Sequence, residues 1–395
     1  MTDFGEELRR LLAERGISLR NIARQVECSP GYLSNVASGR KPLTPSLAVR
    51  LDRVLGTGDQ LIAYALRPEQ EYSSGPDIDL IRRGLDDTLS EGAMAQAALD
   101  DWERMVIRYG RATRDQPAGA LLNGISADLT ELKLTLRRYR SASALRQLTR
   151  IAAQMAGLMG LTFIKLGDRR SFREWARTAR LAASEAGDPV THSWVLAQES
   201  YGHYYSSDFR EAAEVACHAQ DIVRTSPCVG AALAAALEGR AQAAMGHQQA
   251  TRAALARAED ILSHLRGDEL VPSAFGYNEG QLRFHEGSAY TSLHDARSAF
   301  SAQDRALKLC LPGDYTDWAM TRLDRAICLA YSGDTAAALS YALETLAGLT
   351  ETQRRGIITL RGYDLLNNLP ARQDAPEAAR DFRELLMLTT GTERQ

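Results

Sequence analysis

Long apolar runs and paired cysteines are scarce in this sequence of 395 residues. The longest nearly apolar run, residues 151–164, is shorter than the ~20 residues that span a bilayer, so it predicts a buried helix. The five cysteines include no C-x-x-C pair and their number is odd, which argues against a disulfide framework and for a reducing compartment. No signal-peptide pattern follows Met1. We therefore expect a soluble, cytoplasmic protein.

An excess of positive charge is also missing. Lys and Arg total 47 and Asp and Glu total 50, which gives a formal net charge of −3. The chain as a whole therefore lacks the basic balance that is typical of nucleic-acid-binding proteins, and any such surface must be local.

Catalytic and metal-binding signatures are absent from the sequence. The histidines form no H-E-x-x-H pattern, no G-x-S-x-G is present, and no glycine-rich phosphate loop follows a strand pattern. Glu199 and His203 are four residues apart, a spacing that we interpret as a polar pair within one helix. Cys28 is expected to be a small core residue. The sequence therefore predicts a protein that is not an enzyme and has no cofactor or metal.

Helical periodicity extends through nearly the whole chain. Apolar residues recur at i, i+3 and i+4, and alternating strand-type segments are hard to find, so we expect an all-α fold. Residues 1–66 contain five short helical patterns, and residues 67–78 have the Pro, Ser and Gly content of a linker. We expect a helical connector at residues 79–142 and a helical repeat domain at residues 143–395.

The last of these regions contains an internal repeat. Turn markers follow one another at intervals of 40, 39, 47 and 40 residues, at Gly167-Asp168, Ser207-Asp208, Gly246-His247, Leu293-His294 and Gly333-Asp334. Small residues such as Ala212 and Ala219 recur after the markers and allow two helices to approach closely. This period predicts an α-solenoid of five or six helical hairpins. The units resemble tetratricopeptide repeats, although Phe172 and Thr345 occupy positions where a small residue is expected.

Residues 17–42 contain the pattern of two short helices joined by a tight turn. Ser18 is expected to cap the first helix, and Ser29 with Pro30 to begin the second. Gly39 provides the left-handed residue that ends the second helix. By their spacing, the inward-facing residues are Ile22, Ala23, Val26, Leu33 and Val36.

This arrangement resembles the helix-turn-helix domain of the phage-repressor-like (XRE) family over roughly residues 4–66. Three segments fall in register with that family: Ser18-Leu19-x-x-Ile22-Ala23, Ser29-Pro30, and Leu33-Ser34 with Gly39-Arg40. Glu27 replaces the usual glycine of the family, and Ala37 replaces a frequent glutamate. The resemblance implies a small five-helix DNA-binding domain, whose second motif helix enters the major groove by its N-terminal end.

The resemblance also implies which residues contact DNA. They are Ser29, Gly31, Tyr32, Ser34 and Asn35 on the second helix, and Arg20, Arg40 and Lys41 at phosphates. We expect Asn35 to read a base, because a carboxamide pairs bidentately with adenine. Six cations and two anions between residues 17 and 53 give a local charge of +4, which suits the DNA backbone.

Polar and aromatic side chains concentrate on the predicted first helices of the hairpins. They share one helical face in each of three groups: Trp194, Gln198, Tyr201 and Tyr205; Asn278, Gln281 and His285; and Trp318, Arg322 and Arg325. First helices line the concave inner surface of a solenoid, so these residues are candidates for binding an extended peptide or a polar small molecule. The other interpretation is that the aromatic residues pack between hairpins and the arginines are solvated.

The layout resembles bacterial regulators, frequent in actinobacteria, that join an XRE-type DNA reader to a tetratricopeptide-like sensor. In the Gram-positive quorum-sensing group the sensor binds a secreted peptide. The resemblance implies a homodimeric transcription regulator that binds double-stranded DNA and is controlled by a peptide, small molecule or protein. A protein-interaction adaptor that uses the superhelix, with the helix-turn-helix domain as a tether, is the alternative.

Overall fold

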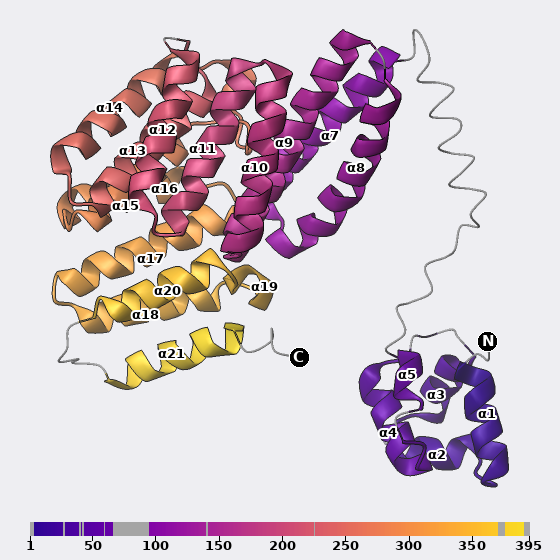
Figure 1. Cartoon of the computed structure of the whole chain (residues 1–395). Coiled ribbons are helices and arrows are strands. Elements are labelled where there is room, and N and C mark those ends of the chain that lie inside the picture. The colour runs from indigo at the N-terminus through magenta and orange to yellow at the C-terminus, as the bar shows by residue number, and fades with distance from the viewer. Residues whose placement is uncertain are drawn as a thin grey trace. The chain divides into compact units, whose positions relative to one another are not determined.

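The computed structural model describes residues 4–26, 28–38, 41, 43–58, 60–65, 95–139, 141–224, 226–369 and 376–390. Within these residues every regular element is a helix, which confirms the all-α prediction (Figure 1). The chain divides into two compact units, Met1–Gly92 and Ala93–Gln395. The expected linker at residues 67–78 lies outside the described residues. In the described part of the chain, no helix has both the length and the apolar character needed to cross a bilayer.

The first unit contains α1 (Phe4–Glu14), α2 (Leu19–Gln25), α3 (Pro30–Ala37), α4 (Pro45–Leu55) and α5 (Ile62–Ala65). Side-chain caps begin three of these helices: the hydroxyls of Ser18, Ser29 and Thr44 accept hydrogen bonds from the backbone three residues ahead. Proline occupies the first position of α3 and α4, where a missing N–H group removes no helical hydrogen bond. Gly56 ends α4 in the left-handed conformation, with φ of 61°.

The core of the first unit confirms the expected inner faces of α2 and α3. Ile22, Ala23, Val26, Leu33 and Val36 are all buried. Buried Asp52 of α4 accepts hydrogen bonds from the backbone N–H groups of Leu61 (2.8 Å) and Ile62 (2.7 Å), and this anchors α5. Glu27 and Gly39, the expected turn and cap residues, lie outside the described residues.

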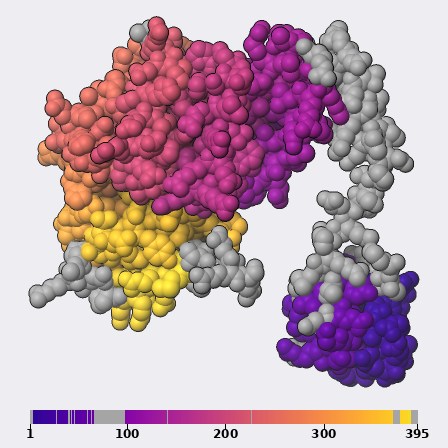
Figure 2. All heavy atoms as spheres, in the orientation of Figure 1, coloured from indigo at the N-terminus to yellow at the C-terminus, as the bar shows by residue number. Residues whose placement is uncertain are grey.

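The second unit is a series of helical hairpins that follow one another along the chain (Figure 1). The pairs are α7 (Ala95–Asp115) with α8 (Ala118–Arg138), α9 (Ala142–Leu166) with α10 (Arg169–Ala186), α11 (Pro189–Tyr205) with α12 (Phe209–Val223), α13 (Val229–Ala244) with α14 (Gln248–His264), α15 (Glu279–Ser292) with α16 (Ala296–Leu309), α17 (Tyr315–Tyr331) with α18 (Thr335–Ala347), and α20 (Ile357–Asn367) with α21 (Pro376–Thr390). Two short helices, η1 (Gly267–Leu270) and α19 (Glu351–Arg354), lie in connections. Each first helix packs on the first helix of the next hairpin, so the hairpins stack into one continuous body (Figure 2).

The turn markers of the repeat lie between the two helices of their hairpins, as the sequence predicts. Gly167, Ser207, Gly246, His294 and Gly333 have φ values of 76°, 66°, 80°, 59° and 89°. The N–H group of the following residue donates to the carbonyl five residues earlier, as from Asp168 to Phe163 at 3.0 Å. In the fourth turn the left-handed residue is His294, the second residue of the marker Leu293-His294. The N–H group of the next residue, Asp295, donates to the Tyr290 carbonyl, as in the other turns.

Small residues fill the contact between the two helices of a hairpin. Ala212, Ala219, Ala299, Ala306 and Ala338 are buried. Where α10 carries Phe172 instead, α11 supplies Gly202, on which a Cβ would lie 2.0 Å from the Phe172 ring. Thr345 is also buried, and its hydroxyl donates to the Tyr341 carbonyl at 2.7 Å. The two exceptions to the repeat pattern are thus accommodated by their neighbours.

The ends of the hairpin series meet. Helix α7 contacts α17, and α9 contacts α20. Arg114 of α7 forms an ion pair with Asp317 of α17 at 2.7 Å. The start of α20 approaches the end of α9 so closely that a Cβ on Gly356 would lie 1.9 Å from the Lys165 carbonyl oxygen. The polar residues of the first helices therefore have protein neighbours on more than one side.

Candidate functional sites

Helix α3 presents its N-terminal half on the surface of the first unit. The Ser29 hydroxyl caps the helix by accepting from the Tyr32 N–H group at 3.1 Å. Ser29, Gly31 and Ser34 are exposed, and a Cβ on Gly31 would meet no atom within 4 Å. Tyr32 and Asn35 are half-buried. The five residues that the sequence assigns to this face thus extend from the N-cap along α3, and three of them are exposed.

The residues expected at phosphates lie on both sides of this helix in the sequence. The Lys41 backbone N–H group donates to the Asn35 carbonyl at 3.1 Å, and its ammonium lies 5.4 Å from the Tyr32 ring centroid. Lys41 and Arg20 are both exposed. Arg40 lies outside the described residues. Lys41 therefore places a positive charge beside the outer face of α3.

Two of the expected ligand residues of α11 are buried between hairpins. The Trp194 side chain is 4% exposed, its indole N–H donates to the Ala274 carbonyl at 2.6 Å, and its ring lies 4.6 Å from the Phe275 ring. Gln198 is also buried, and its side-chain oxygen has no hydrogen-bond partner among the described residues. These contacts make Trp194 part of the packing between α11 and the connection that precedes α15.

Three other expected ligand residues gather around a side chain that the sequence analysis missed. This side chain is Arg240 of α13, and the expected residues are Tyr201, Tyr205 and His285. The Arg240 Cζ atom lies 4.1 Å from the ring centroid of Tyr204, 5.3 Å from that of Tyr205 and 5.8 Å from that of Tyr201. Its Nη2 donates to the Tyr205 hydroxyl at 3.2 Å, and its Nη1 lies 3.4 Å from Nδ1 of His285. Burial and the nearby arginine charges lower the pKa of His285, so its ring is neutral and accepts from Arg240.

A signal for Arg240 was present in the sequence. Helix α13 is rich in alanine, and nearly all of its residues are buried. Arg240 is the only cation in that helix. A single arginine within a buried helix indicates a specific partner, because an ionised side chain is rarely buried without one.

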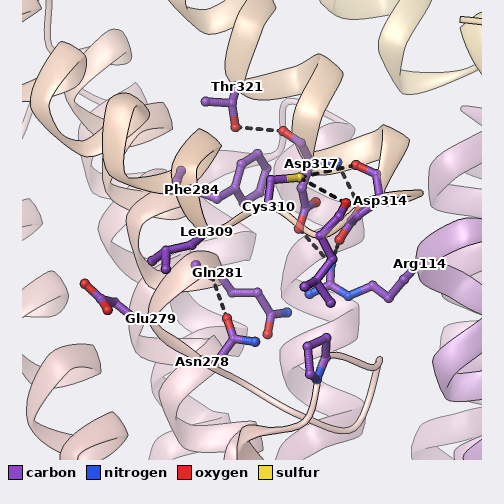
Figure 3. Close-up of a pocket in the computed structure, with 14 residues that line it drawn as sticks. Arg114, Asn278, Glu279, Gln281, Phe284, Leu309, Cys310, Asp314, Asp317 and Thr321 are labelled. Atoms are coloured by element: carbon purple, nitrogen blue, oxygen red, sulfur yellow. Dashed lines mark hydrogen bonds and ion pairs between the residues drawn. The ribbon is translucent and has the colours of Figure 1, made fainter.

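A cavity of about 220 Å³ lies between α7, α15, α16 and α17, and Asn278 and Gln281 line it (Figure 3). Arg114 extends toward Asp314 and Asp317, with N–O distances of 3.2 Å and 2.7 Å. With its amide oxygen turned toward Arg114, Gln281 accepts from Nη2 at 2.7 Å. The Asn278 side chain caps α15 by accepting from the Gln281 N–H group at 3.2 Å.

Several titratable groups in or beside this cavity have shifted pKa values. Burial raises the pKa of Asp314 to about 6, and the neighbouring carboxylate of Asp317 adds to the increase. Burial also raises the pKa of the Cys310 thiol to about 12. Burial lowers the pKa of Lys165, whose ammonium donates to the Thr113 carbonyl. Arg114 lines the cavity together with the acidic residues Glu279, Asp314 and Asp317, which gives the cavity a polar wall.

The third group of expected ligand residues is held by neighbouring helices. The Arg322 guanidinium lies 3.9 Å from the Tyr341 ring and donates to the Thr345 hydroxyl at 2.8 Å. The same guanidinium lies 5.1 Å from the Trp318 ring. Arg325 forms an ion pair with Asp304 at 2.5 Å. The structure therefore does not bring Trp318, Arg322 and Arg325 to the cavity that Asn278 and Gln281 line.

The histidine, cysteine and acidic side chains of the described residues are not assembled into a metal centre. No group of three or more His, Cys, Asp or Glu side chains among them is arranged to hold a metal ion. Glu199 and His203 approach to 3.9 Å within α11, and Arg180 pairs with the same carboxylate at 3.1 Å.

Comparison with known proteins identifies the first unit. Residues 3–65 match the family model described as a helix-turn-helix domain. The chain is also 35% identical over 57 residues to the uncharacterized HTH-type transcriptional regulator YddM of Escherichia coli (strain K12). That match covers 14% of this chain and 61% of YddM, so it spans less than two thirds of that protein. The chain therefore carries an N-terminal helix-turn-helix domain.

Proposed function

We propose that this protein is a sequence-specific DNA-binding transcription regulator whose second unit binds a signal. The observation that carries the proposal is the helix-turn-helix domain at residues 3–65, in which the capped N-terminal end of α3 is accessible. A helix end of this kind enters the major groove in helix-turn-helix proteins. The similarity to a protein described as a transcriptional regulator supports the same function.

Each residue of the proposed DNA surface has a defined part. Asn35 reads a base edge through its carboxamide, with Ser29, Gly31, Tyr32 and Ser34 beside it on α3. Arg20 and Lys41, with Arg40 next in sequence to Lys41, hold phosphates and supply the affinity that depends on salt.

The proposed regulator acts as a homodimer on a two-fold-related operator. A single helix-turn-helix domain contacts few base pairs, and dimers of such domains bind two half-sites separated by one or more turns of DNA. The signal, which is a peptide, a small molecule or a protein, would then favour one arrangement of the two DNA readers.

The signal would bind on the inner side of the hairpins. Tyr201, Tyr205 and His285 meet there around Arg240, and Asn278 and Gln281 line a separate cavity. Concave surfaces that combine apolar walls with a few polar groups are the usual place for ligands. The tetratricopeptide-like character of these hairpins is part of this proposal.

Selection of bound DNA from a genomic pool tests the proposed function. The full-length protein and the Asn35→Ala variant are compared at the same salt concentration, with Arg170→Ala as control because Arg170 is an exposed residue of α10. We expect one symmetric motif with the wild-type and control proteins, and loss of discrimination worth about 1–3 kcal/mol with Asn35→Ala. Recovery of sequence-independent DNA only would contradict the proposal and favour the adaptor.

A further inference from the structure

A second cavity, of about 280 Å³, lies against Arg240. Residues of α10, α11, α12, α13, α17 and α20 and of the α11–α12 turn surround it. Its apolar wall includes Met320, Ile357 and Leu360, and its polar wall includes three arginines against one aspartate, Asp364. The lining therefore combines an apolar surface with an excess of positive charge.

Arg240 is the most deeply buried charge at this cavity. Its side chain is 1% exposed, and the Nε atom has no hydrogen-bond partner. The remaining guanidinium nitrogens contact a tyrosine hydroxyl and a neutral histidine, neither of which carries negative charge. The one acidic residue of α13, Glu238, pairs with Arg257 at 2.6 Å instead. No carboxylate of the described residues forms an ion pair with Arg240.

Other buried arginines of the same unit do have carboxylate partners. Arg361, which lines the same cavity, pairs with Asp324 at 2.5 Å and with Asp364 at 3.1 Å. Arg114 pairs with two aspartates in the other cavity. Because burying an unpaired charge is costly, Arg240 is the arginine of this unit for which an external anion has the most to contribute.

The local electrostatic potential is positive at the cavity wall. Tyr204 is deeply buried, and burial alone would raise its pKa. The charges of Arg240 and Arg361 outweigh that effect and lower the pKa of Tyr204. A negative charge placed in this cavity would therefore be stabilised, in the way that arginines favour the ionised form of a nearby acid.

We propose that the cavity beside Arg240 binds a small organic carboxylate. The carboxylate would lie against the wall that Arg240 shares with Arg169 and Arg361, and the buried guanidinium charge of Arg240 would attract it. The apolar part of the molecule would lie on Met320, Ile357 and Leu360. The volume is at the low end of ligand pockets, which fits a small acid and not a protein segment. The inference names the chemical class of signal for the proposed regulator, and so its role as a signal rests on the proposed function.

Thermal unfolding of the full-length protein with matched acid and amide probes tests the site. The probes are benzoate with benzamide, hexanoate with hexanamide, and inorganic phosphate, and the most stabilising probe is then titrated by calorimetry. We expect at least one carboxylate to raise the melting temperature more than its amide. Arg240→Met should weaken binding of that carboxylate by roughly 10- to 100-fold, because it removes one of the positive charges at the cavity wall. Arg283→Met is the control, because Arg283 pairs with Glu259 and Glu286 and does not line the cavity.

A second variant keeps the proposal testable if Arg240→Met does not fold. Leu360→Trp fills the cavity from a partly exposed position and leaves Arg240 unchanged, so it should also abolish carboxylate binding. Three results would overturn the proposal: equal melting-temperature shifts with acids and amides, carboxylate binding by both variants as strong as that of the wild type, or phosphate binding as strong as that of any carboxylate. DNA affinity is measured separately with and without the bound acid. Carboxylate binding with unchanged DNA affinity would leave the site standing and contradict only the proposed regulation.

Discussion

The two units place their polar side chains in opposite environments. On α3 of the first unit, Ser29 and Ser34 are exposed and Asn35 is half-buried. In the second unit, Gln198 and His285 are buried, and His285 contacts the Tyr201 ring of another helix. A recognition surface on one helix can therefore be predicted from the periodicity of that helix alone. An interior site depends instead on residues that lie far apart in the sequence.

The largest effect that we predict is a loss of stability in the first unit that leaves the stability of the second unit unchanged. Asp52→Ala removes the acceptor of the Leu61 and Ile62 N–H groups and of the Thr57 hydroxyl. Hydrogen bonds to a buried charge are worth about 1.5–3 kcal/mol each, so the first unit should lose about 3 kcal/mol or more. Hydrogen exchange of α4 and α5 measures this loss. All four tryptophans lie in the second unit, so the tryptophan fluorescence transition should be unchanged.

The second-largest predicted effect is a loss of stability at a close helix contact in the second unit. A Cβ on Gly230 of α13 would lie 2.4 Å from the backbone nitrogen of Trp194, so Gly230→Ala should destabilise the hairpins by about 1–3 kcal/mol. The midpoint of urea unfolding, followed by tryptophan fluorescence, provides the measurement. Gly119→Ala of α8 is the matched control in the same unit, since a Cβ there meets open space. Equal midpoints for Gly230→Ala and the wild type would contradict the close packing of α11 and α13.

One carboxyl group in each unit should contribute to stability with opposite pH dependence. Because burial raises the pKa of Asp314 to about 6, the native protein holds a proton there that the unfolded chain releases. The contribution of Asp314 therefore decreases as pH rises from about 4 to about 6, on the order of 1–2 kcal/mol. In the first unit, the hydrogen bond from Arg10 lowers the pKa of Glu7, so its contribution is lost as pH falls.

Asp314→Asn checks the sign of this dependence. An asparagine can still cap α17, but it does not titrate. The unfolding free energy of the wild type minus that of the variant should decrease as pH rises from 4 to 7. Parallel curves for the two proteins would show that burial of Asp314 does not influence stability.

The smallest effect concerns the salt dependence of DNA binding. Arg20→Ala and Lys41→Ala should each reduce the slope of log affinity against log salt concentration by about 1, because each removes one phosphate contact. Titrations at several salt concentrations give the slopes. Arg170→Ala, on an exposed position of the second unit, should leave the slope unchanged. A reduced slope for the control would indicate that the second unit contacts the DNA phosphates.

The sequence predicts local features of both units well. Caps at Ser18 and Ser29 and the left-handed turn at Gly167 depend on a few neighbouring residues, so they can be derived from composition and spacing. The meeting of α7 with α17 cannot, because Arg114 and Asp317 are 203 residues apart. The same limit applies to Arg240, whose tyrosine neighbours belong to another hairpin. Periodicity places Trp194 and Tyr201 on one face of α11 but does not say which of them packs in the interior.

Binding of full-length protein to the selected motif and to a scrambled duplex, followed by fluorescence anisotropy, tests the central claim most directly. The account predicts that the motif binds at least about 1,000-fold more tightly than the scrambled duplex at physiological salt. It also predicts that Asn35→Ala removes about 1–3 kcal/mol of this discrimination, with a smaller change on the scrambled duplex. Equal affinity of the wild-type protein for both duplexes would contradict the claim that α3 reads DNA sequence.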